Sequence, residues 1–140
     1  MNRMRFLSVI AVAGLLAACS SSASSSGPVS DVNATLKEWE FNLDATTGAA
    51  GEVTFHIQND GEKTHEFVVV STDTAADSLP VDEATDTVDE TQFTPVDEVE
   101  DITSGSSAEL TVTLEPGHYV ILCNLESHYA EGMAADFTVE

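Results

Sequence analysis

Eleven residues near the C-terminus, from Cys123 to Met133, carry three kinds of metal-binding side chain on one short stretch. The thiol of Cys123, the imidazole of His128 and the thioether of Met133 follow the spacing Cys-x4-His-x4-Met. Thiolate, imidazole and thioether are soft or borderline ligands, which select copper over hard cations. The sequence therefore indicates a copper site on this stretch.

A second imidazole is needed to complete such a site, and His65 is the best candidate. It opens the apolar run from His65 to Val70 and follows Asn59-Asp60-Gly61, which has the composition of a turn. The plain alternatives are a surface histidine at the start of a strand, a free cysteine that packs as a small hydrophobic residue, and a methionine that fills the core. The presence of all four residues together favours ligation.

These motifs resemble those of the cupredoxins, the blue copper proteins typified by plastocyanin and azurin, and most closely the small, membrane-tethered members. The resemblance rests on residues 59–67 (Asn-x-Gly-x-x-x-His-Glu-Phe), on residues 116–119 (Pro-Gly-His-Tyr) leading into Cys123, and on Cys-x4-His-x4-Met. It implies one copper ion per chain, bound by His65, Cys123 and His128 with Met133 as a weak axial ligand. It also implies that the outer ring edge of His128 serves as the exit for electrons.

The ligand loop departs from the plastocyanin pattern in length. Four residues separate Cys123 from His128, where plastocyanins have two, so the loop is nearer to that of azurin, auracyanin or rusticyanin. The binuclear site of cytochrome oxidase needs a second cysteine on this loop, whereas position 127 is serine, so we expect a mononuclear site. Oxygen ligation in a red-type copper site stays open because three glutamates lie near the motifs: Glu66, Glu126 and Glu131.

The remaining histidines and the tryptophan are expected to lie outside the site. His56 and His118 each alternate with residues that face inward, so their side chains should point away from the core. Trp39 is most simply interpreted as a core residue.

The hydrophobic pattern predicts an all-β domain. Apolar residues alternate with polar ones around Phe55 and again around Val112, which is the period of a half-buried strand. Tyr119, Ile121 and Cys123 share one face of a further strand whose other face is also apolar, residues 135–139 form a last strand, and residues 36–43 are predicted as one strand. Short strands between turns indicate a Greek-key β-sandwich or barrel, which is also the fold that the cupredoxin resemblance implies.

Residues 71–105 lose this pattern and are rich in Asp and Glu. A structureless loop of that length is improbable inside a compact domain. We therefore expect short elements at about residues 79–81 and 96–102, with acidic loops between them.

The N-terminal residues predict export and anchoring. Residues 1–18 have the basic start, short apolar run and small residues of a signal peptide. Leu16-Ala17-Ala18-Cys19 resembles a bacterial lipobox, which implies a lipid anchor on Cys19, while the alternative is cleavage after Ala18 with Cys19 unmodified. The Ser-rich residues 20–30 then form, with Cys19, a linker (19–30) before a single domain over residues 31–140.

The charge balance excludes some partners. All 25 acidic residues lie from Asp31 onward, against Lys37 and Lys63 as the only basic residues there. Such an excess of negative charge disfavours nucleic acid and anionic lipid as partners. It fits docking to a basic patch on a redox protein, and equally an acidic proteome adapted to high salt.

We therefore predict an electron carrier rather than an enzyme. The chain would be a monomer on the outer side of a membrane, in the periplasm or at the cell surface, and would pass single electrons between redox proteins such as cytochromes or oxidases, with no small-molecule substrate. The alternative is a copper chaperone or storage protein that delivers copper to an oxidase. Such sites tend to be open and rich in methionine, whereas Met133 is the only methionine after residue 18.

Overall fold

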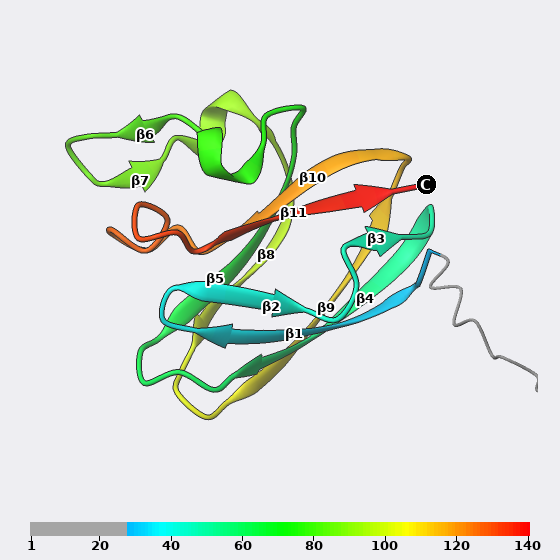
Figure 1. The fold of residues 1–140 in the computed structure, drawn as a ribbon, viewed down its shortest axis with the longest axis horizontal. Coiled ribbons are helices and arrows are strands. Elements are labelled where there is room, and N and C mark those ends of the chain that lie inside the picture. Colours follow the sequence, from blue (N-terminus) through cyan, green and yellow to red (C-terminus); the bar gives the residue numbers. More distant parts are fainter. Residues whose placement is uncertain (1–27) are drawn as a thin grey trace, which may run out of the picture.

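Two β-sheets form the body of the protein in the computed structural model, which describes residues 28–140 (Figure 1). One sheet has the order β2-β1-β4-β9, with the bounds β1 (Asp31–Lys37), β2 (Glu40–Leu43), β4 (Gly51–Asn59) and β9 (Ser107–Leu114). The other has the order β3-β11-β10-β5-β8, with the bounds β3 (Thr47–Gly48), β11 (Ala134–Val139), β10 (Gly117–Leu122), β5 (His65–Ser71) and β8 (Thr94–Ile102). The chain crosses between the sheets at β2–β3, β3–β4, β4–β5, β8–β9 and β9–β10. The predicted β-sandwich is confirmed.

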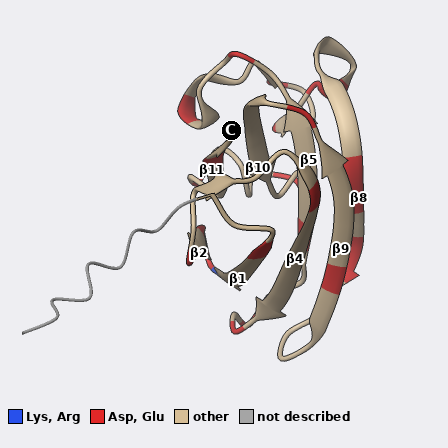
Figure 2. Ribbon diagram, turned by 90° about the vertical axis from the view of Figure 1, so that its right-hand side faces the viewer, with Lys and Arg blue, Asp and Glu red and all other residues tan. Residues whose placement is uncertain are grey.

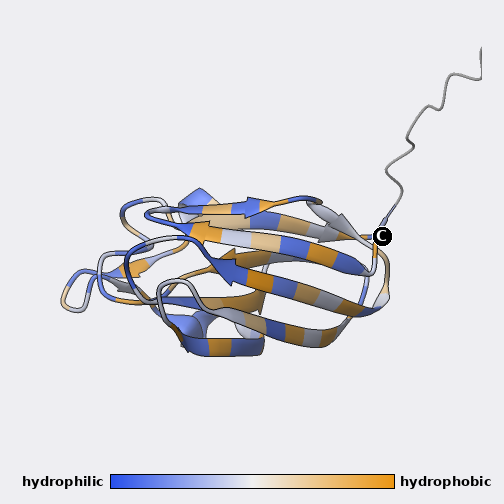
Figure 3. Cartoon of the chain, turned by 90° about the horizontal axis from the view of Figure 1, so that it is seen from below, coloured by the Kyte–Doolittle hydropathy of each residue, from blue (hydrophilic) through white to orange (hydrophobic). Residues whose placement is uncertain are grey.

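The main core lies between the two sheets and explains the alternating pattern along the strands (Figure 3). Phe55 packs against Phe67 at 5.2 Å and against Phe137 at 5.3 Å between ring centroids, which joins the facing strands β4, β5 and β11. Burial of these apolar side chains supplies most of the driving force for folding.

A second apolar cluster covers the outer face of the five-stranded sheet. Its members include Val68 and Val70 from β5 and Val120 and Leu122 from β10. This cluster explains why β10 is apolar on both faces, as the sequence indicated. The segment that covers it is the acidic excursion, defined here as residues 72–93 (upper part of Figure 1).

The acidic excursion contains four short elements: a 3-10 helix η1 (Ala76–Ser78), β6 (Val81–Asp82), β7 (Thr87–Val88) and a 3-10 helix η2 (Glu90–Gln92). β6 and β7 pair as a small hairpin. The element predicted at about residues 79–81 overlaps β6 at Val81 alone, and the short element predicted at about residues 96–102 is part of the nine-residue strand β8. The elements η1, β7 and η2 were not predicted.

The prediction of one strand over residues 36–43 was wrong. The chain reverses at Glu38 and Trp39, so that β1 and β2 pair antiparallel with Leu36 opposite Phe41. β1 begins at Asp31 and also pairs in parallel with β4. The sequence signal for β1 was the alternation of Val32, Ala34 and Leu36, which are all buried in the structure. This signal is weak because alanine is only slightly hydrophobic and is depleted in strands.

Both ends of the described chain lie at the same end of the sandwich (Figure 1). Val29 bridges Gly48, and Gly48 pairs with Val139 of the last strand. The loop between β10 and β11 lies at the opposite end (Figure 1). The predicted signal peptide (1–18), the anchor at Cys19 and most of the 19–30 linker lie outside the described residues. Within those residues, no helix has the length and apolar character needed to cross a bilayer.

Candidate metal centre

The ends of two neighbouring strands position the first two candidate ligands. His65 is the first residue of β5, and Cys123 directly follows β10. β5 and β10 are paired, with Val68 opposite Leu122. His128 and Met133 lie on the loop that runs from β10 to β11, so the sheet brings together residues from two distant parts of the sequence.

Three donor atoms converge at this point. Sγ of Cys123 lies 3.2 Å from Nδ1 of His128 and 4.0 Å from Nδ1 of His65, and the two Nδ1 atoms are 3.3 Å apart. A metal ion in a trigonal plane, with bonds of about 2.0 Å to nitrogen and about 2.3 Å to sulfur, would separate the nitrogens by about 3.5 Å and each nitrogen from sulfur by about 3.7 Å. The donors therefore fit a single ion.

The sulfur of Cys123 lies in an apolar environment but accepts a hydrogen bond. Cys123 is fully buried, and the backbone N–H of Glu66 donates to its Sγ at 3.2 Å. Burial raises the pKa of the thiol, while the N–H groups of Glu66 and Leu125 act in the opposite direction. Metal binding would supply the remaining stabilisation of the thiolate, since coordination and loss of the proton are coupled.

His65 is fully buried, and burial lowers its pKa, although the carboxylate of Glu38 opposes this effect. The turn before it is fixed by the buried side chain of Asn59. Asn59 donates to the carbonyls of Lys63 and Ile102, both at 2.7 Å, and accepts from the N–H of Gly61 at 2.9 Å. The position of His65 is therefore determined by hydrogen bonds as well as by packing.

His128 is 9% exposed, so it is the candidate ligand closest to solvent. Burial, and then the neighbouring His65, lower its pKa. Both histidines are thus held in the neutral form that binds metals. Trp39 contacts the ring of His128 edge-on, with 4.7 Å between the ring centroids. Trp39 packs against the core cluster, as expected, but it is only partly buried and its ring also contacts the candidate ligand, which the sequence did not indicate.

Backbone hydrogen bonds close the ligand loop on itself. The N–H of Cys123 donates to the carbonyl of Met133, and the N–H of Met133 donates to the carbonyl of His128, both at 3.1 Å. Gly132 has a φ of 108°, a conformation that favours glycine. Met133 is fully buried and belongs to the same core cluster as Cys123.

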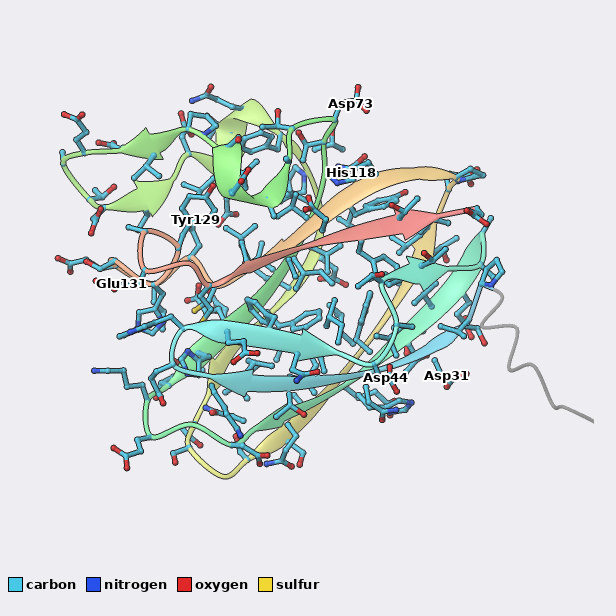
Figure 4. All side chains as sticks on the ribbon, in the orientation of Figure 1. Asp31, Asp44, Asp73, His118, Tyr129 and Glu131 are labelled. Carbon is cyan, nitrogen blue, oxygen red and sulfur yellow. The ribbon has the colours of Figure 1, made fainter. Side chains whose placement is uncertain are left out.

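The acidic excursion supports the loop from outside. The hydroxyl of Tyr129 donates to the carbonyl of Ala76 and accepts from the N–H of Leu79, both at 2.8 Å (Figure 4). The N–H of Ser127 donates to the carbonyl of Asp86 at 3.0 Å. Because Tyr129 and Ser127 are both hydrogen-bonded to the acidic excursion, the ligand loop cannot change shape without breaking these bonds.

The other candidates lie away from the three donors. His56 lies between Asp31 at 3.3 Å and Glu109 at 3.2 Å, and His118 lies 3.0 Å from Asp136 at the far end of β10. The expectation that both lie outside the site is confirmed. Among residues 28–140, no carboxylate joins the group of His65, Cys123 and His128, which weakens the oxygen-ligation alternative raised by Glu66, Glu126 and Glu131.

The sequence of most of the chain, residues 15–140, matches the family model of the sulfocyanin (SoxE) domain. The chain belongs to the sulfocyanin family. No curated protein gave a significant match. The sulfocyanin family match, the folds of solved auracyanin and rusticyanin, and the group of His65, Cys123 and His128 identify the chain as a cupredoxin, a blue copper protein with one type 1 copper ion per chain.

Solved structures of blue copper proteins share the fold of this sulfocyanin-family chain. Reduced auracyanin from Roseiflexus castenholzii is 25% identical, with a TM-score of 0.59 over 81% of this chain and 99% of that one. Auracyanin A from Chloroflexus aurantiacus is 22% identical, with a TM-score of 0.55 over 81% and 100%. Rusticyanin from Thiobacillus ferrooxidans is 16% identical, with a TM-score of 0.54 over 80% and 79%.

Two residues next to the sulfocyanin-type site were missed by sequence reasoning. Glu38 and Trp39, consecutive in the β1–β2 turn, approach His65 and His128 respectively. No motif marks them, because their contacts depend on where the β1–β2 hairpin lies relative to β5.

Proposed function

We propose that the protein is a mononuclear copper electron carrier that binds its ion through His65, Cys123, His128 and Met133. Cupredoxins are copper electron-transfer proteins, and copper bound here would supply a one-electron couple. The observation that carries the proposal is the convergence of three donor atoms within 4.0 Å on a hydrogen-bonded framework. A framework that holds its ligands in place keeps the reorganisation on electron transfer small.

Burial of the site favours a carrier over a copper chaperone. His65 and Cys123 are 0% exposed and His128 is 9% exposed. A protein that hands copper to another needs an accessible site, whereas an electron can leave through a ring edge without displacing ligands. His128, the candidate ligand closest to solvent, is therefore the proposed exit.

The proposed setting is the outer face of a membrane. Cupredoxins are typically extracytoplasmic, and the lipobox-like sequence before Cys19 supports a lipid anchor. The proposed partners are redox proteins such as cytochromes or oxidases that present a basic or neutral surface, since acidic residues occur on β4, β8 and β9 (Figure 2). The protein would act as a monomer.

The decisive experiment is the visible spectrum of the purified protein after addition of Cu(II), with Cys123→Ser as the matched variant. We expect an intense thiolate-to-copper charge-transfer band that the variant lacks, and reversible one-electron voltammetry. A wild-type protein without the band, or one that binds only Cu(I) and transfers it to an acceptor protein, would favour the chaperone.

The anchor needs a separate test. In a bacterial host, we expect the wild-type chain in the membrane fraction with the mass of an acylated Cys19. The Cys19→Ser variant should be released or remain unprocessed. An unmodified N-terminal Cys19 in the soluble fraction would argue for an ordinary signal peptide.

A further inference from the structure

One ring nitrogen of His65 has no well-directed hydrogen bond within the described part of the chain. Its Nδ1 faces Cys123 and His128, which makes Nδ1 the ligand atom, so the proton of the neutral ring belongs on Nε2. Nε2 is buried without a hydrogen-bond partner of good geometry. It lies 3.3 Å from Oε1 of Glu38, within ion-pair distance although off the direction of an ideal hydrogen bond.

Glu38 is itself held by the turn that precedes His65. Its Oε1 accepts hydrogen bonds from the N–H groups of Glu62 at 2.8 Å and Lys63 at 2.7 Å. These two hydrogen bonds fix the carboxylate of Glu38 in position beside His65.

Gly61 leaves the space that Glu38 occupies. A Cβ at position 61 would lie 2.6 Å from Oε1 of Glu38 and 3.0 Å from its Cδ. Glycine is needed here for space, because any larger residue would push the carboxylate aside. The Asn59-x-Gly61 turn and the β1–β2 turn thus fit together around the outer edge of His65.

We propose that Glu38 is a positioning residue of the copper centre, which accepts the Nε2 proton of His65, fixes the ring and lowers the reduction potential of the ion. A carboxylate partner makes an imidazole ligand more basic. The nearby negative charge also stabilises Cu(II) more than Cu(I), because Cu(II) carries the larger charge. Both effects lower the reduction potential of the copper ion. The inference rests on the proposed ligation of copper by His65.

The test is the midpoint potential of the copper-loaded protein, measured for the wild type and three variants. Glu38→Gln keeps an oxygen acceptor for the turn but removes the charge. Loss of an outer partner typically costs about tenfold or more in metal affinity, so we expect the preference for Cu(II) to fall about tenfold, a rise of about 59 mV for one electron. Gly61→Ala should raise the potential in the same direction at unchanged net charge, because it displaces the carboxylate.

Glu62→Gln is the matched control, since it removes the same charge from an exposed neighbour on the same turn. The proposal is overturned if Glu38→Gln raises the potential no more than Glu62→Gln does, or if Gly61→Ala leaves it at the wild-type value. Should Glu38→Gln fail to fold, Gly61→Ala carries the test against the same control.

Nuclear magnetic resonance of the Cu(I) form gives a second readout. The Nε2 proton of His65 should exchange slowly with solvent in the wild type and faster in Glu38→Ala, and equal exchange rates would contradict the proposal. Failure of this inference is distinguishable from failure of the proposed function. If the wild-type protein lacks the charge-transfer band, the proposed function as a copper carrier is rejected. If the band is normal but the variants leave the reduction potential unchanged, only the proposed role of Glu38 is rejected.

Discussion

The ring of Trp39 meets the ring of His128 edge to face, with the centroids 4.7 Å apart and the planes inclined at 69°. Nζ of Lys63 lies 5.7 Å from the centroid of the same tryptophan ring, within cation–π range. Because Glu38 precedes Trp39, one turn between β1 and β2 contacts both imidazoles of the site. A hairpin from the four-stranded sheet thus completes a centre whose candidate ligands all belong to β5 and to the loop between β10 and β11.

Removal of the Trp39 ring should open the site. We expect Trp39→Leu to lose about 1 kcal/mol of folding free energy, the typical worth of an aromatic pair, and to increase the exposure of His128. Copper should then pass to an external chelator several-fold faster than from the wild type. Trp39→Phe, which keeps an aromatic edge, is the control. Equal rates for all three proteins would show that Trp39 does not protect the site.

Replacement of Met133 tests its proposed role as axial ligand. Met133→Leu nearly conserves side-chain volume, so the cost in stability should stay below about 1.5 kcal/mol. The charge-transfer band should persist because it arises from Cys123, whereas the reduction potential should rise because a donor to Cu(II) is lost. Voltammetry of the two proteins measures this difference. An unchanged potential would indicate that Met133 only packs in the core.

Asn59 should be the most sensitive polar residue of the turn before His65. Asn59→Ala leaves the carbonyls of Lys63 and Ile102 and the N–H of Gly61 without their partner, and the loss should be about 3 kcal/mol or more. Chemical denaturation of the metal-free protein measures it. The control is Asn42→Ala, at an exposed position on β2. Similar losses for both variants would contradict the assigned hydrogen bonds.

Crowded carboxylates near the site should make stability depend on pH. Burial raises the pKa of Glu66, and its neighbours Glu100, Glu98 and Glu90 raise it further. A group with a raised pKa binds its proton more tightly in the folded state, so the stability that it contributes is lost as the pH rises above about 4.5. Glu98→Gln removes one like charge and should therefore raise the Tm at about pH 7 but not at about pH 4.

Two controls apply to this prediction, one in which the salt concentration is raised and one in which a carboxylate is removed elsewhere on the surface. The gain from Glu98→Gln should shrink in about 1 M salt, where charges more than about 3 Å apart are screened. Glu52→Gln, at an exposed position on β4 in the other sheet, should give a smaller gain. A gain that is equal at both pH values would mean that side-chain packing, and not charge, is responsible.

Much of the site could be predicted from the sequence because its residues carry distinctive chemistry. Cys123 and His128 are close in sequence, and His65 begins an apolar strand, so their convergence followed from motif spacing and strand pattern. The contacts of Glu38 and Trp39 could not be predicted in this way. They depend on where the chain reverses, and the single strand expected over residues 36–43 concealed that reversal.

The acidic excursion shows the same limit. Its composition predicted loops with short elements. The hydrogen bonds that join it to the hydroxyl of Tyr129 and to the backbone N–H of Ser127 are tertiary contacts that no local pattern encodes. By contrast, the two apolar faces of β10 were visible in the sequence, and the structure buries the outer face in the second apolar cluster.

The placement of the chain entry and the ligand loop at opposite ends of the sandwich affects how a redox partner can approach the site. The described chain enters the fold at one end of the sandwich, and the loop that carries His128 lies at the opposite end (Figure 1). An attachment through the N-terminal residues would therefore leave the surface around His128 uncovered. A molecule that exchanges electrons through His128 would then reach that residue without contacting the segment that leads into β1.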